Sequence, residues 1–215
     1  RPPRSTPSNS SAASDVYKRQ PIKSLDEVYE DLRAEGKTEV AVQIAMVMYG
    51  SEFRQALSYS TRGLNVKYGW PLLFEPESGQ NVARILSAGF GPEGTATVLC
   101  AHGNESYPEY NAPLVELDDY LRRVYDDVYL ATVEGPPGTD CFQDILSSGV
   151  ERVHFIPLMM VAGDHIENDV MGDDPDSWRS RLGLPATADR GLAANPGVME
   201  VFLDSIAGLL EDFQG

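Results

Sequence analysis

Apolar and polar residues alternate along the chain in segments whose spacing predicts helices and strands in turn. The stretch 24–36, "SLDEVYEDLRAEG", has apolar residues at helical spacing, with Ser24 placed to cap its start and Gly36 to end it. The apolar run 38–50, "TEVAVQIAMVMYG", predicts a buried strand that ends at Gly50. Residues 51–79 show neither pattern, and we expect mainly loop and extended chain there.

From residue 79 onward the same alternation continues to the end of the chain. Helices are predicted over 79–91, 110–125, 139–149 and 197–213, and buried strands over 95–103, 127–135 and 151–163. Strands that alternate with helices are typical of α/β proteins with a parallel sheet and right-handed crossovers. The fold class predicted from the pattern is therefore α/β.

Composition narrows the possible functions. The 215 residues carry a formal net charge of −16, which argues against nucleic acid and anionic membranes as partners because both would be repelled. No apolar run is long enough to predict a membrane span. The two cysteines, Cys100 and Cys141, form no metal or redox motif and no disulfide framework. No glycine-rich phosphate loop follows any predicted strand, so an organic nucleotide cofactor is not expected.

The first twenty residues, "RPPRSTPSNSSAASDVYKRQ", are rich in Ser, Pro and Arg, contain no Met and have no apolar core of a signal peptide. We expect residues 1–20 to be a non-native, disordered leader and the native sequence to start near Pro21, inside the protein. We expect a cytoplasmic protein, but a hidden native N-terminus leaves periplasmic export open as an alternative.

Three successive predicted strands are each followed by a side chain that can bind metal or carry a proton. His102 ends the strand 95–103, Glu134 ends the strand 127–135, and His165 follows the strand 151–163. Ligands of parallel α/β sheets bind beyond the carboxyl ends of the strands, so these side chains are expected to converge. Imidazole with carboxylate suits Co, Ni, Fe or Zn, and the same groups serve as acid and base near neutral pH. Each residue alone could equally be a turn or loop residue.

Two other polar features have simpler interpretations. His154 lies within a predicted strand and is expected to be structural. The acidic stretch 172–178, "GDDPDSW", lacks the spacing of a calcium loop, and we expect Asp176 or Ser177 to cap a helix through "SWRSRLG".

Three stretches resemble the anaerobic cobalt chelatases of the class II chelatase superfamily. These are "AHGNE" (101–105), "ATVEG" (131–135) and above all "PLMMVAGDHIENDVMGDDPDSW" (157–178). The resemblance implies a chelatase-like, flavodoxin-like fold of two similar lobes around a cleft. It also implies insertion of Co²⁺ into sirohydrochlorin, a tetrapyrrole, during anaerobic cobalamin biosynthesis, a branch of porphyrin biosynthesis. His102, Glu134 and His165 fall on the family's catalytic and metal-binding positions, with His102 expected to be the principal base.

The resemblance also carries expectations about the domains and the cleft. We expect a partial N-terminal lobe over 21–90, which lacks its opening strand and helix, and a C-terminal lobe over 91–215 that carries the metal site. The last helix could pack back on the first lobe, and the truncated chain could be inactive. Met46 stands where many relatives carry a histidine, and it and Glu52 are expected to face the substrate cleft. Arg54 and Arg62 are candidates to offset the acidic charge near a polycarboxylate substrate.

The sequence leaves several alternatives open. Ni²⁺, Fe²⁺ or Zn²⁺ could replace Co²⁺, since these metals prefer similar ligands, and the substrate could be a related tetrapyrrole. A tetrapyrrole- or metal-binding protein without turnover is the alternative from another class. Homo-oligomerisation is also left open. No organic cofactor, nucleic acid or membrane partner is expected.

Overall fold

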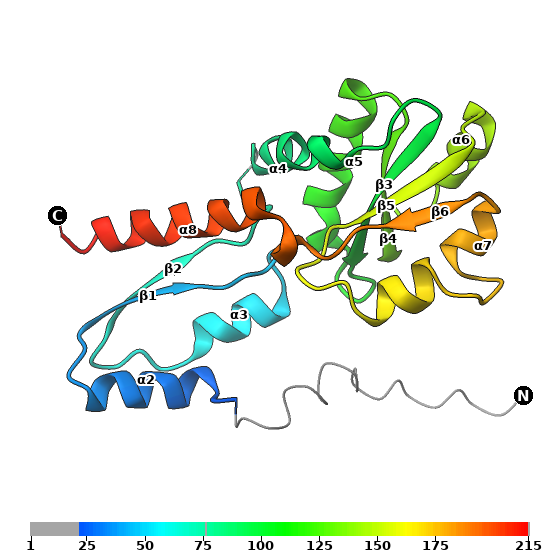
Figure 1. The fold of residues 1–215 in the computed structure, drawn as a ribbon. Helices are drawn as coiled ribbons and strands as arrows, with labels where there is room; N and C mark the ends of the chain where they lie inside the picture. The colour runs from blue at the N-terminus through cyan, green and yellow to red at the C-terminus, as the bar shows by residue number, and fades with distance from the viewer. Residues whose placement is uncertain (1–21, 76, 215) are drawn as a thin grey trace, which may run out of the picture.

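The computed structural model describes residues 22–75 and 77–214, and in them the chain forms two separate parallel sheets (Figure 1). One sheet has two strands in the order β1-β2, and the other has four in the order β4-β3-β5-β6. The α/β class predicted from the sequence is confirmed. The leader expected over residues 1–20 lies outside the described residues.

The two-stranded sheet pairs β1 (Glu39–Gln43) with β2 (Asn65–Gly69). The predicted first helix is α2 (Leu25–Ala34). Its capping box joins the Ser24 hydroxyl and the Glu27 carboxylate to each other's backbone N–H groups. Figure 1 shows β1 and β2 between α8 on one face and α2 with α3 on the other.

The strand predicted to run to Gly50 ends instead at Gln43, which corrects the sequence reading. The side-chain amide of Gln43 donates to the backbone carbonyl oxygens of Ile44 and Trp70. A side chain therefore bonds these two acceptors where the pairing of β1 with β2 ends. The residues beyond Gln43 remain apolar because Val47 and Met48 pack against the larger hydrophobic core. Burial in the core, rather than strand structure, explains the second half of the apolar run.

The segment 51–79 was expected to be mainly loop and extended chain, and this expectation is wrong for much of it. It contains α3 (Ser51–Ser58), the strand β2, and the first residues of α4 (Ser78–Leu86). α3 buries only Phe53, so its sequence shows a single apolar anchor instead of a sustained helical stripe. A short helix with one buried residue gives too weak a pattern to be recognised.

The four-stranded sheet has β3 (Thr95–Gly103) at its centre, paired with β4 (Val128–Glu134) and β5 (Arg152–Pro157). Side chains of β3 alternate between two cores. Leu99 points into the cluster with α4 and α5 (Ala112–Val124), whereas Val98 and Cys100 point into the cluster with α6 (Cys141–Ser148) and α7 (Trp178–Leu182). A strand covered on both faces is apolar throughout, which explains why β3 was predicted correctly.

The strand predicted over 151–163 ends at Pro157, again because the apolar run continues into buried loop residues such as Leu158. The chain then forms a π-helix, η3 (His165–Val170), that the sequence pattern did not predict. Ser177 caps α7 by accepting from the Ser180 N–H, as the sequence predicted. The short edge strand β6 (Ala186–Ala188) was also not predicted.

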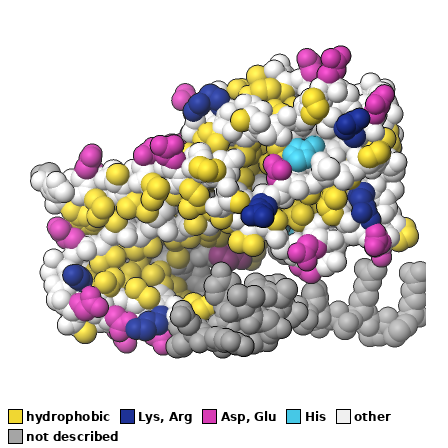
Figure 2. Space-filling view, viewed as in Figure 1, with side chains coloured by type: hydrophobic (Ala, Val, Ile, Leu, Met, Phe, Trp, Pro, Cys, Tyr) yellow, Lys and Arg dark blue, Asp and Glu magenta, His cyan; other side chains and the backbone are white. Residues whose placement is uncertain are grey.

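The last helix, α8 (Pro196–Glu211), connects the two sheets. It packs against β1 and β2, and its Val198 and Phe202 belong to the same core cluster as Leu86 of α4 and Leu117 of α5. The face in Figure 2 shows hydrophobic side chains over α8 and the two-stranded sheet. Leu203 and Leu210 of α8 are exposed. α4 precedes residue 90, but it packs against α5, which covers the four-stranded sheet. The division into lobes at residue 90 stays a prediction. None of the described helices has the length and apolar character needed to cross a membrane.

Candidate functional site

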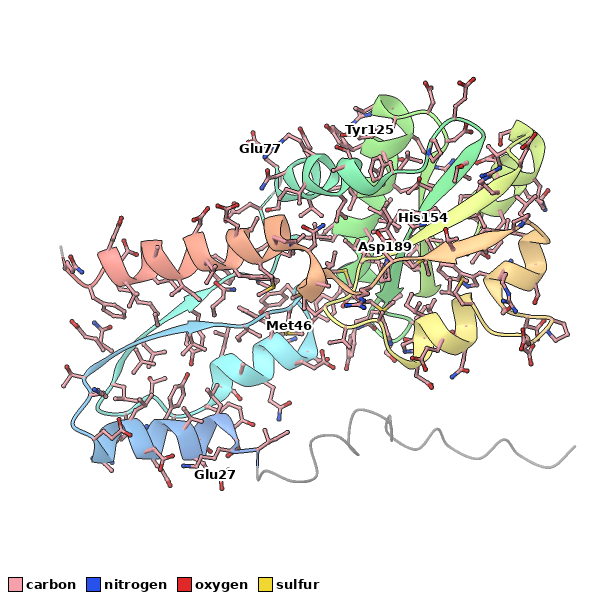
Figure 3. All side chains as sticks on the ribbon, viewed as in Figure 1. Glu27, Met46, Glu77, Tyr125, His154 and Asp189 are labelled. Carbon is pink, nitrogen blue, oxygen red and sulfur yellow. The ribbon has the colours of Figure 1, made fainter. Side chains whose placement is uncertain are left out.

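The carboxyl ends of β3 and β4 lie side by side and carry two of the predicted site residues. Gly103 and Glu134 are paired across the two strands, and His102 immediately precedes Gly103. A cavity of about 470 Å³ opens at this edge, between the strand ends and the segment that follows β1. Its wall includes Met46, Tyr49, Glu52, His102, Tyr110 and Glu134. The structure thus places four predicted residues, Met46, Glu52, His102 and Glu134, around one space. Figure 3 shows Met46 where the two sheets meet.

His165 lies directly against His102. The centroids of the two imidazole rings are 4.5 Å apart, and the rings meet edge to face at 85°. His102 comes from the end of β3 and His165 from the first residue of the π-helix that follows β5. Two residues separated by more than sixty positions in the sequence therefore meet at the edge of the four-stranded sheet.

Each of these histidines is held by its Nδ1 atom. The Nδ1–H of His102 donates to the carbonyl oxygen of Gly103 at 2.8 Å, and the Nδ1–H of His165 donates to the carboxylate of Asp169 at 2.6 Å. Because carbonyl and carboxylate oxygens only accept, the proton of each neutral ring is on Nδ1. Nε2 of both rings keeps its lone pair for a metal ion or a proton.

Asp169 is a site residue that the sequence reasoning missed. It lies four residues after His165, and both residues belong to η3. A carboxylate that accepts from the second nitrogen of a histidine fixes the ring's orientation and makes it a better metal ligand. The i,i+4 spacing of the histidine and the aspartate was a usable signal, but only if this stretch was first recognised as helical.

Two features fix the chain that follows His102. Gly103 has φ 76°, and a Cβ added to it would lie 1.9 Å from the carbonyl oxygen of Glu134. The Nδ2 atom of Asn111, which is fully buried, donates to the carbonyl oxygen of Asn104. The site therefore requires glycine at position 103 and a buried amide behind the loop.

Aromatic residues from both sides of the cavity form an aromatic wall beyond the strand ends. Tyr49 and Tyr110 line it, with ring centroids 6.1 Å apart, and Tyr107 lies 5.6 Å from Tyr110. Tyr49 also contacts Phe74, which stacks on the half-exposed Trp70 at 4.0 Å. The sequence analysis did not find this wall, because its members come from three separate segments of the chain.

The structure also shows which candidates are not brought together. Within residues 22–75 and 77–214, no group of three His, Cys, Asp or Glu side chains lies close enough to hold one metal ion. Sharing of a single ion by His102, Glu134 and His165 therefore stays a prediction. His154 lies on β5, where it bonds to Thr187 and faces Asp189 (Figure 3).

The acidic stretch before α7 takes part in local structure. Asp173 forms an ion pair with Arg179, and the carboxylate of Asp174 accepts from the backbone N–H of Asp176. These contacts stabilise the turn that leads into the Ser177 cap. The interpretation of this stretch as the start of a helix agrees with them.

The fold and site together define a class of protein. Two structures of SirB from Bacillus subtilis, one with Fe³⁺ and one of the sirohydrochlorin chelatase with cobalt, superpose with TM-scores of 0.62 and 0.55. They cover 93% and 94% of this chain and are matched over 88% and 86% of their own lengths, each at 13% sequence identity. The chain therefore has the fold of the chelatases.

Sequence comparison identifies the family within this class. Residues 11–211 match the family described as Cobalt chelatase (CbiK). The sirohydrochlorin cobaltochelatase of Salmonella typhimurium is 29% identical over 187 residues, which are 81% of this chain and 69% of that protein. The sirohydrochlorin cobaltochelatase CbiKC of Nitratidesulfovibrio vulgaris is 31% identical over 204 residues, or 86% of this chain and 71% of that protein. The chain belongs to the cobalt chelatase (CbiK) family, and the resemblance found in the sequence is confirmed.

Proposed function

We propose that this chain is a metal chelatase, a lyase that inserts Co²⁺ into sirohydrochlorin in anaerobic cobalamin biosynthesis. The observation that carries the proposal is the contact between His102 and His165, with ring centroids 4.5 Å apart, at the edge of a cavity that Glu134 also lines. Family membership supports this function, because both curated relatives are named sirohydrochlorin cobaltochelatase.

Insertion of a divalent ion requires the inner N–H protons of the tetrapyrrole to leave as the metal arrives. His102 lines the cavity, and its Nδ1–H is held by Gly103, so its Nε2 lone pair is the natural acceptor for these protons. Imidazole is the side chain best suited to accept and release protons near neutral pH. We assign His102 as the principal base on these grounds.

His165 and Glu134 have the chemistry to deliver the metal. The Nε2 lone pair of His165 is available because Asp169 holds its Nδ1–H. Glu134 ends β4 and is partly buried at the cavity wall, where a carboxylate attracts a dication more strongly than it would in bulk water. A donor set of imidazole and carboxylate binds Co²⁺ or Ni²⁺ well but releases it more readily than a closed thiolate site would.

The metal is proposed as a substrate, and Co²⁺ is preferred over Ni²⁺, Fe²⁺ or Zn²⁺ because the curated relatives are named for cobalt. No organic cofactor has a part in the proposed reaction. The oligomeric state and the cytoplasmic location are predictions from the sequence only.

The proposed function is tested by an anaerobic assay with sirohydrochlorin and Co²⁺ that follows the absorbance change on metallation. We expect insertion well above the rate without protein, and a lower rate when Ni²⁺ replaces Co²⁺. A spectral shift on binding, without metallation above the blank, would instead identify a carrier without turnover. Absence of both changes would contradict any tetrapyrrole function.

A further inference from the structure

The charge of the cavity does not match the charge of the proposed substrate. Sirohydrochlorin carries acetate and propionate side chains, and the protein itself has a formal net charge of −16. Among the described residues that line the cavity, none is Lys or Arg, whereas Glu52 and Glu134 are both present. A polycarboxylate that enters this space would need a cation close by, because unpaired charges of the same sign repel each other strongly in a partly dry cleft.

Arg54 is placed at the mouth of this cavity. It lies in the first turn of α3, two residues after Glu52, and Gly50, Ser51 and Glu52 all line the cavity. Its guanidinium Nη1 donates to the hydroxyl oxygen of Tyr110 at 3.2 Å. Tyr110 comes from the short helix η2 (Pro108–Asn111) after β3, and it lines the same cavity. The contact therefore bridges the mouth from α3 to the four-stranded part of the molecule.

Tyr110 is itself held in position by its neighbours. Its ring packs between Tyr49 and Tyr107, with centroid distances of 6.1 and 5.6 Å. Its hydroxyl oxygen accepts from Arg54, so its own O–H hydrogen is free to donate. Among the described residues, Tyr110 is the one hydrogen-bond partner of the exposed Arg54 guanidinium, and the fork geometry of the other N–H groups matches a carboxylate. Two donors thus converge at the rim of a cavity lined by aromatic rings.

We propose that Arg54 and Tyr110 form a carboxylate-binding subsite for one side chain of the tetrapyrrole. The proposal rests on the proposed function. The carboxylate would accept one hydrogen bond from an N–H of Arg54 and one from the O–H of Tyr110. The flat macrocycle would lie along the rings of Tyr49, Tyr107 and Tyr110. The role is to position the ring, and no proton transfer or metal contact is assigned to either residue.

The chain offers a matched control for Arg54. Arg62 follows α3 in the turn before β2, at the opposite end of the helix from the cavity. Its backbone carbonyl accepts from Arg33, and its exposed side chain takes no part in the cavity wall. Arg62→Ala changes the net charge by the same amount as Arg54→Ala, so the pair separates a local contact from the overall field of the protein.

The experiment measures anaerobic binding of metal-free sirohydrochlorin to the full chain through the tetrapyrrole's own absorbance. Arg54→Ala should raise Kd about three- to tenfold, as expected for loss of an exposed, charge-assisted hydrogen bond from arginine to a carboxylate. Tyr110→Phe should raise Kd about twofold, and Arg62→Ala should leave it within about 1.5-fold. The methyl ester of sirohydrochlorin, which lacks the charges, should bind wild type and Arg54→Ala equally.

Equal Kd values for Arg54→Ala and Arg62→Ala would overturn the subsite, and so would an equal loss of affinity for the ester. Because no metal is present, these outcomes are independent of turnover. If wild type binds the acid and Arg54→Ala binds it less tightly, but no Co²⁺ is inserted, the subsite stands and the chelatase function fails.

Discussion

The two sides of the cavity are built differently. His102 and Glu134 lie at the ends of β3 and β4, and the residues before His102 are almost completely buried between two cores. The opposite side consists of the irregular segment after β1, which contributes Met46 and Tyr49, and the first turn of α3, which contributes Glu52. β1 itself contains no fully buried residue and has one paired neighbour. A side with few buried contacts opens and shifts at lower free-energy cost than a doubly covered strand.

This difference assigns separate tasks to the two sides. Groups that handle protons and metal need fixed positions, and they come from the four-stranded sheet. Groups that hold a large flat ring need to accommodate its entry, and two of them, Tyr49 and Arg54, come from the less buried side. The predictions below test whether chemistry and positioning are divided in this way.

The largest effect is expected from His102→Ala. Removal of the principal base should lower kcat for cobalt insertion by about 100-fold or more, because general base catalysis typically contributes that much. The measurement is the anaerobic insertion rate at saturating sirohydrochlorin and Co²⁺. His154→Ala is the control, since His154 bonds to Thr187 away from the cavity wall and should leave kcat within about twofold.

A His102→Ala variant that kept the full insertion rate while remaining folded by circular dichroism would refute the assignment of the base. It would also remove the main reason to place the chemistry on the strand side of the cavity.

The next largest effect is expected from Asp169→Ala, which frees the Nδ1 of His165. Loss of an orienting carboxylate typically weakens a metal site by about 10- to 100-fold, and we expect Kd for Co²⁺ to rise by about tenfold. Titration calorimetry without tetrapyrrole measures this directly. Asn168→Ala is the matched control, because it breaks the neighbouring bond from Asn168 to Asp164 in the same π-helix without touching His165. If both variants bound Co²⁺ equally, Asp169 would have no role in metal binding.

The smallest effect is expected from Met46→Leu on the opposite side. Leu has a similar volume and apolar character, so KM for Co²⁺ should stay within about threefold if Met46 only shapes the cavity wall. The measurement is the dependence of the insertion rate on Co²⁺ concentration. A rise in KM for Co²⁺ of more than about tenfold, the factor expected for Kd in Asp169→Ala, would indicate that the Met46 sulfur binds the metal, and the division between the two sides would not hold.

Much of the fold was predictable because the four-stranded sheet is covered on both faces. Its strands β3, β4 and β5 appear as largely apolar runs, and the rule that ligands lie beyond the carboxyl ends of parallel strands pointed to His102, Glu134 and His165. The same apolar signal failed where a strand is followed by a buried loop, as after Gln43 and after Pro157. Hydrophobicity reports burial, and it does not distinguish a strand from irregular chain that packs on the same core.

The sequence by itself determined the α/β class, the family and the residues with the chemistry to handle a metal and protons. Local patterns encode these features through periodicity, strand ends and a long family-specific stretch. Only the tertiary structure decided that His102 contacts His165, that Asp169 and Gly103 fix their Nδ1 atoms, and that Arg54 meets Tyr110, 56 residues away, at the mouth of the cavity. The first and last of these contacts join distant segments, and their distances depend on how sheets and helices pack. The two Nδ1 contacts are local in sequence, but they depend on the backbone after β3 and on the π-helix η3, which the residue pattern did not predict.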